Sequence, residues 1–350
     1  LETLAIADQP PVEEGRSWGL VEIVDRTDEP PTPAVIIDRT RAAIVTGAQR
    51  GWDVFVLVPR RGYARAVRCG RCGQLRVCQR CDAALAADGP CVRCGTPSTT
   101  CVACGSSTWQ GIGAGIGSVV EDLRRSLGRS VGTVEDRRPV TVGTERDLLD
   151  AGSVDLAVAV DLDTVARAPT YRAAEDALRL GVRLSHLVTR GSGRRTVVQT
   201  SDHGQPVVDA LRSGRWTTFM DSESGLRRAA AFPPYGELLA LEVADAPDDL
   251  DSRLRSAVSS ATIMGPATMR DRTRWRLQGA DLTDAKGRRR PLVRTLSDAG
   301  HRVRVDVDPI DLGRLTERLA GPIAHTSPWI RVRGYPCEPW PSTRSARSPT

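Results

Sequence analysis

The feature that most constrains this chain is a run of eight cysteines between positions 69 and 104. They form four CxxC pairs, at Cys69/Cys72, Cys78/Cys81, Cys91/Cys94 and Cys101/Cys104. A CxxC turn places two sulfurs on one ion, and zinc takes four ligands in a tetrahedron, so eight thiols predict two four-cysteine zinc sites. Neither site leaves a position open for a water molecule, which indicates a structural rather than a catalytic metal.

Disulfides and a thioredoxin-like redox pair are disfavoured, because the pairs repeat evenly and no βαβ redox pattern lies nearby. The sequence shows no signal-peptide pattern and no apolar run long enough to cross a membrane, so we expect a cytoplasmic protein with reduced thiols. The ninth cysteine, Cys337, lies in a stretch rich in Pro, Ser and Arg and is not predicted to be a ligand. The segment has little apolar material, so metal binding would supply most of its folding free energy.

Counting does not decide which pairs share an ion, because four pairs combine in three ways. If the stretch between Cys81 and Cys91 closes a hairpin, the two inner pairs meet, and the two outer pairs meet at its stem. In this nested arrangement the ends of the segment return to one place. The sequence therefore predicts that residues 69–105 are an insertion in a larger domain.

The flanking sequence predicts an α/β domain. Strand patterns occur at 54–58, 131–136, 153–163 and 195–200, and helical spacing at 118–127 and 171–181. Strands that alternate with helices form a mostly parallel sheet. The first 35 residues carry little regular pattern, and PPVEEG at 10–15 and DEPPTPA at 28–34 are predicted to be loops. Asp161 and Asp163, at the end of the third strand pattern, are predicted to be solvated rather than to bind a ligand.

The net charge is +6, and every basic residue except Lys286 is an arginine. A candidate nucleic-acid surface combines an aromatic ring with phosphate-binding charge; it comprises Arg270, Arg272, Arg274, Trp275 and Arg276, followed by Arg288, Arg289 and Arg290. The alternative, a core Trp275 beside solvated arginines, is equally compatible with the sequence. Arg60 and Arg61, in a basic turn beside the cysteines, are predicted to make a second DNA contact.

One family shows the same order of segments: LETL, FVLVPRRGYARAVRCGRCG, three further CxxC pairs, AVAVDLD, YRAAED, VVQT, FPPYGELLALEV and VRVDVDP. Over residues 1 to about 312, the chain resembles the second half of the PriA family of primosomal replication-restart helicases. The resemblance implies an α/β, RecA-like second helicase lobe with an inserted two-zinc segment, followed by a small α+β domain. The implied boundaries are 1–68 and 106–233 for the lobe, 69–105 for the insertion, 234–313 for a C-terminal DNA- or partner-binding domain and 314–350 for a disordered tail.

The resemblance also implies the nested ligand pairing. One zinc would bind Cys69, Cys72, Cys101 and Cys104, and the other Cys78, Cys81, Cys91 and Cys94. The implied partners are forked and single-stranded DNA, other primosome components, the replicative helicase and single-stranded DNA-binding protein, with no membrane. The first residue, Leu1 in place of Met, indicates a fragment or an unusual start.

The chain departs from the family where ATP is handled. A GxxxxGK[ST] phosphate-binding loop and an acidic Mg²⁺ motif are characteristic of the family's first lobe, and neither occurs here. The family's QVAGRAGR motif corresponds to LVTRGSGR at 187–194, in which Arg194 is the one arginine still in place. We therefore predict a vestigial nucleotide site at Arg194 and no catalytic residue, and two zinc ions rather than ATP are the expected cofactors.

The predicted function is a replication-restart protein that recognises abandoned forks and promotes reloading of the replicative helicase, without helicase activity of its own. One alternative is an ATP-dependent 3′–5′ DNA helicase whose first lobe is missing from this chain, which ATP hydrolysis stimulated by forked DNA would indicate. A stand-alone zinc-ribbon RNA-binding protein is disfavoured by the α/β pattern around the cysteines. Comparable affinity for structured RNA and forked DNA would support it.

Overall fold

The computed structural model describes residues 18–30, 32, 34–58, 66–79, 83–87, 97–111, 116–168, 170–269 and 272–309. Within these residues the largest element is a six-stranded sheet of order β1-β8-β7-β2-β6-β5. Its strands are β1 (Val21–Asp25), β2 (Val54–Leu57), β5 (Val131–Thr133), β6 (Val140–Gly143), β7 (Leu156–Ala159) and β8 (Arg195–Thr200). Every neighbouring pair is parallel. The predicted α/β class is therefore confirmed, and the sheet is consistent with a RecA-like lobe.

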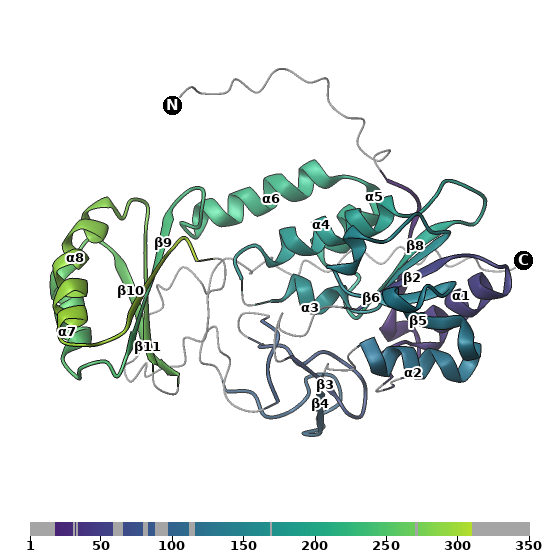
Figure 1. The fold of residues 1–350 in the computed structure, drawn as a ribbon, viewed down its shortest axis with the longest axis horizontal. Helices are drawn as coiled ribbons and strands as arrows, with labels where there is room; N and C mark the ends of the chain where they lie inside the picture. Colours follow the sequence, from purple (N-terminus) through teal and green to yellow (C-terminus); the bar gives the residue numbers. More distant parts are fainter. Residues whose placement is uncertain are drawn as a thin grey trace, which may run out of the picture.

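Helices cover both faces of this sheet (Figure 1). They are α1 (Asp38–Gln49), α2 (Ile116–Leu127), α3 (Leu162–Ala166), α4 (Ala173–His186), α5 (Pro206–Ser213) and α6 (Trp216–Ala229). Successive side chains of a strand point to opposite faces, so Val54 and Val56 of β2 join one apolar core with α1 and α2. Phe55 and Leu57 join the other core with α3, α4 and α5. Burial on both faces explains why β2 is an unbroken apolar run.

The strand and helix patterns agree with the structure except at the ends of two strands. The strand predicted at 153–163 is shorter: β7 is Leu156–Ala159, and Leu162 and Asp163 already belong to α3. The strand predicted at 131–136 ends at Thr133, because Asp136 Oδ2 accepts hydrogen bonds from the Thr133 backbone N–H at 2.7 Å and hydroxyl at 3.0 Å. This capping box turns the chain into a 3₁₀ helix at Val134–Asp136. Val21–Asp25 lies in the first 35 residues, where the sequence predicted no strand, and it pairs with β8 as an edge strand.

A second, antiparallel sheet follows the lobe. It contains β9 (Glu237–Ala244), β10 (Thr262–Met269), β11 (Arg272–Gly279) and β12 (Val303–Val307), with α7 (Leu250–Ala257) and α8 (Thr283–Asp298). The element order βαββαβ and the strand order β10-β11-β9-β12 define a ferredoxin-like topology. Both helices pack on the same face of the sheet, in one core with Leu239, Leu241 and Val243 of β9. Figure 1 shows α7 and α8 as the outermost layer, away from the parallel sheet.

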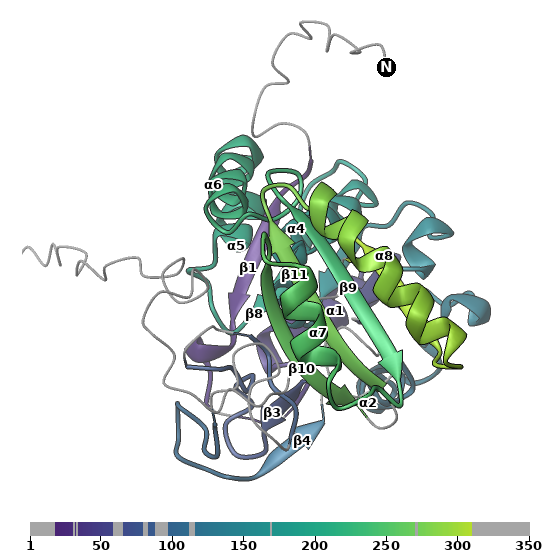
Figure 2. The ribbon, with the colours of Figure 1, turned by 90° about the vertical axis from the view of Figure 1, so that its left-hand side faces the viewer.

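The cysteine-rich segment begins and ends in a two-stranded ribbon. Its strands β3 (Val67–Cys69) and β4 (Trp109–Gly111) are antiparallel, with Cys69 opposite Trp109. The ribbon follows β2 and precedes α2, and its strands lie side by side in both views (Figures 1 and 2). The segment thus leaves the lobe and returns to it at one place. None of the described helices is long and apolar enough to cross a membrane.

Candidate metal centre and the polar network beside it

Two CxxC turns face each other at the base of the insertion. In the first turn, the Gly73 backbone N–H donates to the Cys69 carbonyl oxygen at 2.9 Å, and in the second, the Gly105 N–H donates to the Cys101 carbonyl oxygen at 2.8 Å. Gly73 and Gly105 have φ angles of 72° and 71°. Glycine is favoured in this left-handed region because it has no Cβ. The repeated geometry explains the glycine that follows the second cysteine of each pair.

The structure brings the two outer cysteine pairs together. The sulfurs of Cys69, Cys72, Cys101 and Cys104 all lie within 4.8 Å of one another. The distance is 3.5 Å between the sulfurs of Cys69 and Cys104 and 3.6 Å between those of Cys72 and Cys101. A tetrahedral ion with metal–sulfur bonds of about 2.3 Å needs sulfur separations of about 3.8 Å. The four thiols therefore fit one tetrahedral metal, and an all-sulfur donor set favours zinc or iron.

Burial and hydrogen bonds act in opposite directions on these thiols. Burial raises the pKa of Cys69, but hydrogen bonds from the backbone N–H groups of Cys72 and Arg71 and from Cys104 outweigh it and lower this pKa to about 6. Burial raises the pKa of Cys72 to about 12 and also raises that of Cys101. Four adjacent thiols cannot all ionise without a nearby cation, and a bound divalent ion supplies that charge.

Most of the second predicted site lies outside the described residues. Cys78 is described: it is buried, and its backbone N–H donates to the Ala83 carbonyl oxygen at 2.9 Å. The predicted residues that fall outside the described part are Cys81, Cys91, Cys94, Arg60 and Arg61 of the basic turn, Arg270 of the candidate nucleic-acid surface, and the tail 314–350. A second ion therefore stays a prediction.

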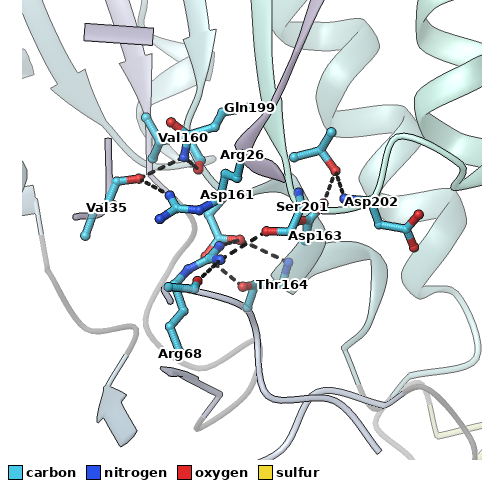
Figure 3. A network of polar contacts seen from close by, with 12 residues as sticks. Arg26, Val35, Arg68, Val160, Asp161, Asp163, Thr164, Gln199, Ser201 and Asp202 are labelled. Carbon is cyan, nitrogen blue, oxygen red and sulfur yellow. Dashed lines mark hydrogen bonds and ion pairs between the residues drawn. The ribbon is translucent and has the colours of Figure 1, made fainter. Parts of the chain in front are cut away.

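A buried polar network lies between the first CxxC turn and the carboxyl edge of the parallel sheet (Figure 3). Arg68, the residue before Cys69, is 5% exposed. Its guanidinium forms an ion pair with Asp161 at 2.7 Å and donates to the Gly73 carbonyl oxygen at 3.1 Å. Asp161 also caps α3, where its carboxylate accepts a hydrogen bond from the Thr164 hydroxyl at 2.8 Å. The insertion and the lobe therefore share one buried charge pair.

The neighbouring acid, Asp163, is held inside the lobe. Its carboxylate accepts hydrogen bonds from the Thr200 hydroxyl at 2.6 Å and from the Ser201 backbone N–H at 2.7 Å. Burial, followed by repulsion from Asp161, raises the pKa of Asp163. Asp161 and Asp163 are each 2% exposed. The prediction that they are solvated was wrong, because α3 and the insertion cover the strand end.

Asp163 should make the stability of the lobe depend on pH. A carboxyl whose pKa is higher in the folded than in the unfolded protein loses stabilisation as pH rises between the two values. In Asp163→Asn, the amide can donate to Thr200 and accept from Ser201, so both hydrogen bonds remain. We expect the variant to match the parent below about pH 4, the ordinary carboxyl range, and to exceed it in stability at neutral pH. Urea unfolding below about pH 4 and at neutral pH tests this expectation. The same difference in unfolding free energy between variant and parent at both pH values would contradict it.

Arg26 and Gln199 complete the network on the side of β1 (Figure 3). The Arg26 guanidinium and the Gln199 amide both donate to the Val35 carbonyl oxygen, at 3.0 Å and 2.8 Å. Gln199 also donates to the Val160 carbonyl oxygen at 2.8 Å. Burial, followed by repulsion from Arg68, lowers the pKa of Arg26 to about 10, so that the side chain stays charged at neutral pH. At the ends of β1, β7 and β8 the carboxyl edge is therefore filled by the protein's own side chains.

Arg194, predicted to mark a vestigial nucleotide site, binds a carboxylate of the lobe itself. Its Nε lies 2.8 Å from Asp155 Oδ1. The side chain borders an open groove of about 600 Å³ between the start of β1 and the loop before β8. The guanidinium is therefore oriented by Asp155 rather than left free in the groove.

Three of the four described β11 side chains that were predicted to contact DNA are buried. Trp275 is 2% exposed, lies in the core beneath α7 and α8, and donates its indole N–H to Asp251 at 2.9 Å. It has no face available for a base, so of the two interpretations compatible with the sequence the structure supports a core Trp275 and not a stacking one. Arg274 and Arg276 are also buried, whereas the Arg272 side chain is 45% exposed.

No protein-family model matches the chain. The probable replication restart protein PriA of Mycobacterium tuberculosis is 30% identical over 234 residues, which are 60% of this chain and 34% of that protein. The corresponding Deinococcus radiodurans protein is 29% identical over 310 residues, 75% of this chain and 32% of its own length.

A more distant relative gives the same result. The replication restart protein PriA of Bacillus subtilis is 24% identical over 225 residues, which are 55% of this chain and 28% of that protein. The chain thus spans about a third of the length of the curated relatives it matches. These matches support the family resemblance that the cysteine run and its flanking segments indicated, and they identify the chain as a PriA-like protein that corresponds to one part of its relatives.

Proposed function

We propose that the chain acts in replication restart: it binds forked DNA at abandoned replication forks and, with partner proteins, promotes reloading of the replicative helicase. The observation that carries this proposal is the sequence similarity to replication restart proteins over more than half of the chain. The four-cysteine centre on an α/β lobe supports it, because the family resemblance rests most strongly on that combination. The proposed cofactors are two structural zinc ions.

We further propose that the protein has no helicase activity of its own. Within the lobe that the chain does contain, the stretch LVTRGSGR at 187–194 keeps only Arg194 in place of the two arginines of the family's QVAGRAGR motif. The ion pair of Arg194 with Asp155 supports the proposal, since it competes with any contact to a phosphate. The test is ATP hydrolysis by the longest natural form of the protein. We expect no stimulation by forked DNA, and stimulation would favour the alternative, a 3′–5′ helicase.

Helix α8 offers a more accessible basic face for DNA than β11. Arg290 and Arg294 lie one turn apart and are exposed, and within the described part of the chain neither forms an ion pair. Arg288, by contrast, pairs with Asp284 at 2.7 Å. A planar guanidinium suits bidentate contact with phosphate, and α8 belongs to the outermost layer of the molecule (Figure 1). We therefore place the principal described DNA contact on α8.

The salt dependence of fork binding tests this placement. We expect Arg290→Gln/Arg294→Gln to weaken binding and to reduce the slope of log affinity against log salt by about 0.9 for each lost contact to duplex DNA. Arg288→Gln is the control, because its guanidinium is already paired with Asp284. Fluorescence anisotropy over a range of salt concentrations measures the slope, and an unchanged slope in the double variant would exclude α8. Equal affinity for structured RNA would favour an RNA-binding protein instead.

A further inference from the structure

We propose that Arg68 is a positioning residue for the metal centre, and that its ion pair with Asp161 couples ion binding at the outer cysteines to the carboxyl edge of the parallel sheet. The inference requires an ion at Cys69, Cys72, Cys101 and Cys104 but is independent of fork binding. It rests on three features: where Arg68 lies in the CxxC turn, how the turn packs on the lobe, and what Asp161 holds in place.

Arg68 is bound to both ends of the first CxxC turn. It precedes Cys69 in the chain, and its guanidinium donates to the carbonyl oxygen of Gly73, the residue after Cys72. The same guanidinium reaches Asp161 at 2.7 Å and lies 3.4 Å from the Ser201 hydroxyl. Any change in the turn that shifts Gly73 therefore shifts a guanidinium whose other side-chain contacts, among the described residues, are with Asp161 and Ser201 of the lobe.

The turn also packs directly against the lobe. A Cβ on Gly73 would lie 1.9 Å from the Thr32 carbonyl oxygen and 2.6 Å from the Arg26 guanidinium. Arg26 in turn donates to the Val35 carbonyl oxygen, in the chain segment before α1. The metal-binding turn thus packs so closely on the segment that contains Thr32 and Val35 that even a methyl group on Gly73 would not fit. A movement of the turn would therefore also move this segment.

Asp161 links this contact to the sheet. Asp161 follows β7 and caps α3 by accepting a hydrogen bond from the Thr164 backbone N–H at 3.3 Å. The charge of Arg68 therefore lies where the strand ends and the helix begins. Separation of the pair would leave Asp161 buried beside Asp163 without this cation, and uncompensated buried charge is strongly unfavourable. Release of the turn is therefore resisted by the lobe, and by linkage an ion that holds the turn also stabilises the strand end.

The location of the Arg68–Asp161 ion pair has a functional consequence. Open α/β sheets bind their ligands at the carboxyl ends of the strands. Here that edge is occupied by Arg68, which comes from the inserted segment. With an ion bound, the metal centre would keep Arg68 paired with Asp161 at this edge. Loss of the ion would destabilise α3 at the same end of the lobe. The insertion is thus a structural support for the lobe as well as a surface appended to it.

The test uses the double variant Arg68→Met/Asp161→Asn, which removes both charges together and avoids an unpaired buried ion. Asn retains an oxygen to cap α3. We expect the variant to fold and to bind zinc on the order of 10-fold more weakly than the parent, as for other residues that support metal ligands. Zinc affinity is measured by competition with a chromophoric chelator. Hydrogen exchange at residues 162–166 is measured with and without zinc, and zinc should slow it in the parent but not in the variant.

A matched control is Arg41→Met/Asp122→Asn, which removes an ion pair of the same 2.7 Å length between α1 and α2. It should leave zinc affinity unchanged and leave the effect of zinc on α3 intact. Equal zinc affinity in the Arg68 variant and the parent, or equal protection of α3 by zinc in both, would overturn the proposal. Failure of the parent to bind zinc at the outer cysteines would overturn it as well, whatever the outcome of fork binding.

Discussion

Cys69→Ser is expected to abolish metal binding at the outer centre and to unfold the base of the insertion. A site with three thiolates and one hydroxyl loses most of its affinity for zinc. In small zinc-binding peptides, the binding of a structural zinc ion contributes about 10–16 kcal/mol to the free energy of folding. The contacts of the first CxxC turn with the lobe should then be lost as well, because Cys69 directly follows Arg68. Metal analysis of the purified protein should show two zinc ions in the parent and one in the variant.

The other cysteines provide the controls for this result. Cys104→Ser should remove the same ion as Cys69→Ser, because the two sulfurs lie 3.5 Å apart. Cys78→Ser should remove the second, predicted ion, and Cys337→Ser should remove neither. Loss of the same ion in the Cys69 and Cys78 variants would contradict the nested pairing. X-ray absorption spectra with nitrogen ligands would contradict all-thiolate sites.

The parts of the structure that the sequence predicted best are those fixed by local pattern. The CxxCG spacing determines the two turns, because each depends on a glycine with positive φ four residues after the first cysteine. The strand β2 was recognisable because a strand buried on both faces is apolar throughout. The edge strand β1 was missed because Val21–Asp25 contains two acids among three apolar residues, and its pairing with β8 joins residues more than 170 positions apart.

The polar network could not be predicted because its partners are distant in sequence. Gln199 accepts a hydrogen bond from the Ile37 backbone N–H at 3.0 Å across 162 positions. Arg68 finds its carboxylate, Asp161, in another segment of the lobe. A basic or acidic residue at the end of a strand is usually solvated, and no local pattern marks the few that become buried pairs. The fold alone brings these groups together.

The burial of Trp275, by contrast, was readable from strand alternation. In β11, RTRWRLQG, the residues at 272, 274, 276 and 278 share one face, and Trp275 and Leu277 share the other. The ring therefore belongs with the apolar residues rather than with the arginines beside it. A stacking platform would need Trp275 and the arginines beside it to share one face, which a strand does not permit. Alternation therefore favours the core interpretation of Trp275 over the stacking one.

Trp275→Ala is expected to destabilise the C-terminal sheet by about 3–5 kcal/mol, the usual cost of truncating a large core side chain. The change removes the ring from the core. It also removes the hydrogen bond of 2.9 Å that the indole N–H donates to the Asp251 carboxylate. The loss is measured by urea unfolding of the whole chain, in the unfolding transition of the C-terminal sheet.

Trp216→Ala is the control, because that ring is 37% exposed at the start of α6 and its truncation should cost much less stability. Single-stranded DNA affinity, measured well below the unfolding transition, should be unchanged in both variants, because a ring buried under α7 and α8 has no surface on which a base can stack. A selective loss of single-stranded DNA affinity with unaltered stability would show that Trp275 leaves the core to bind DNA.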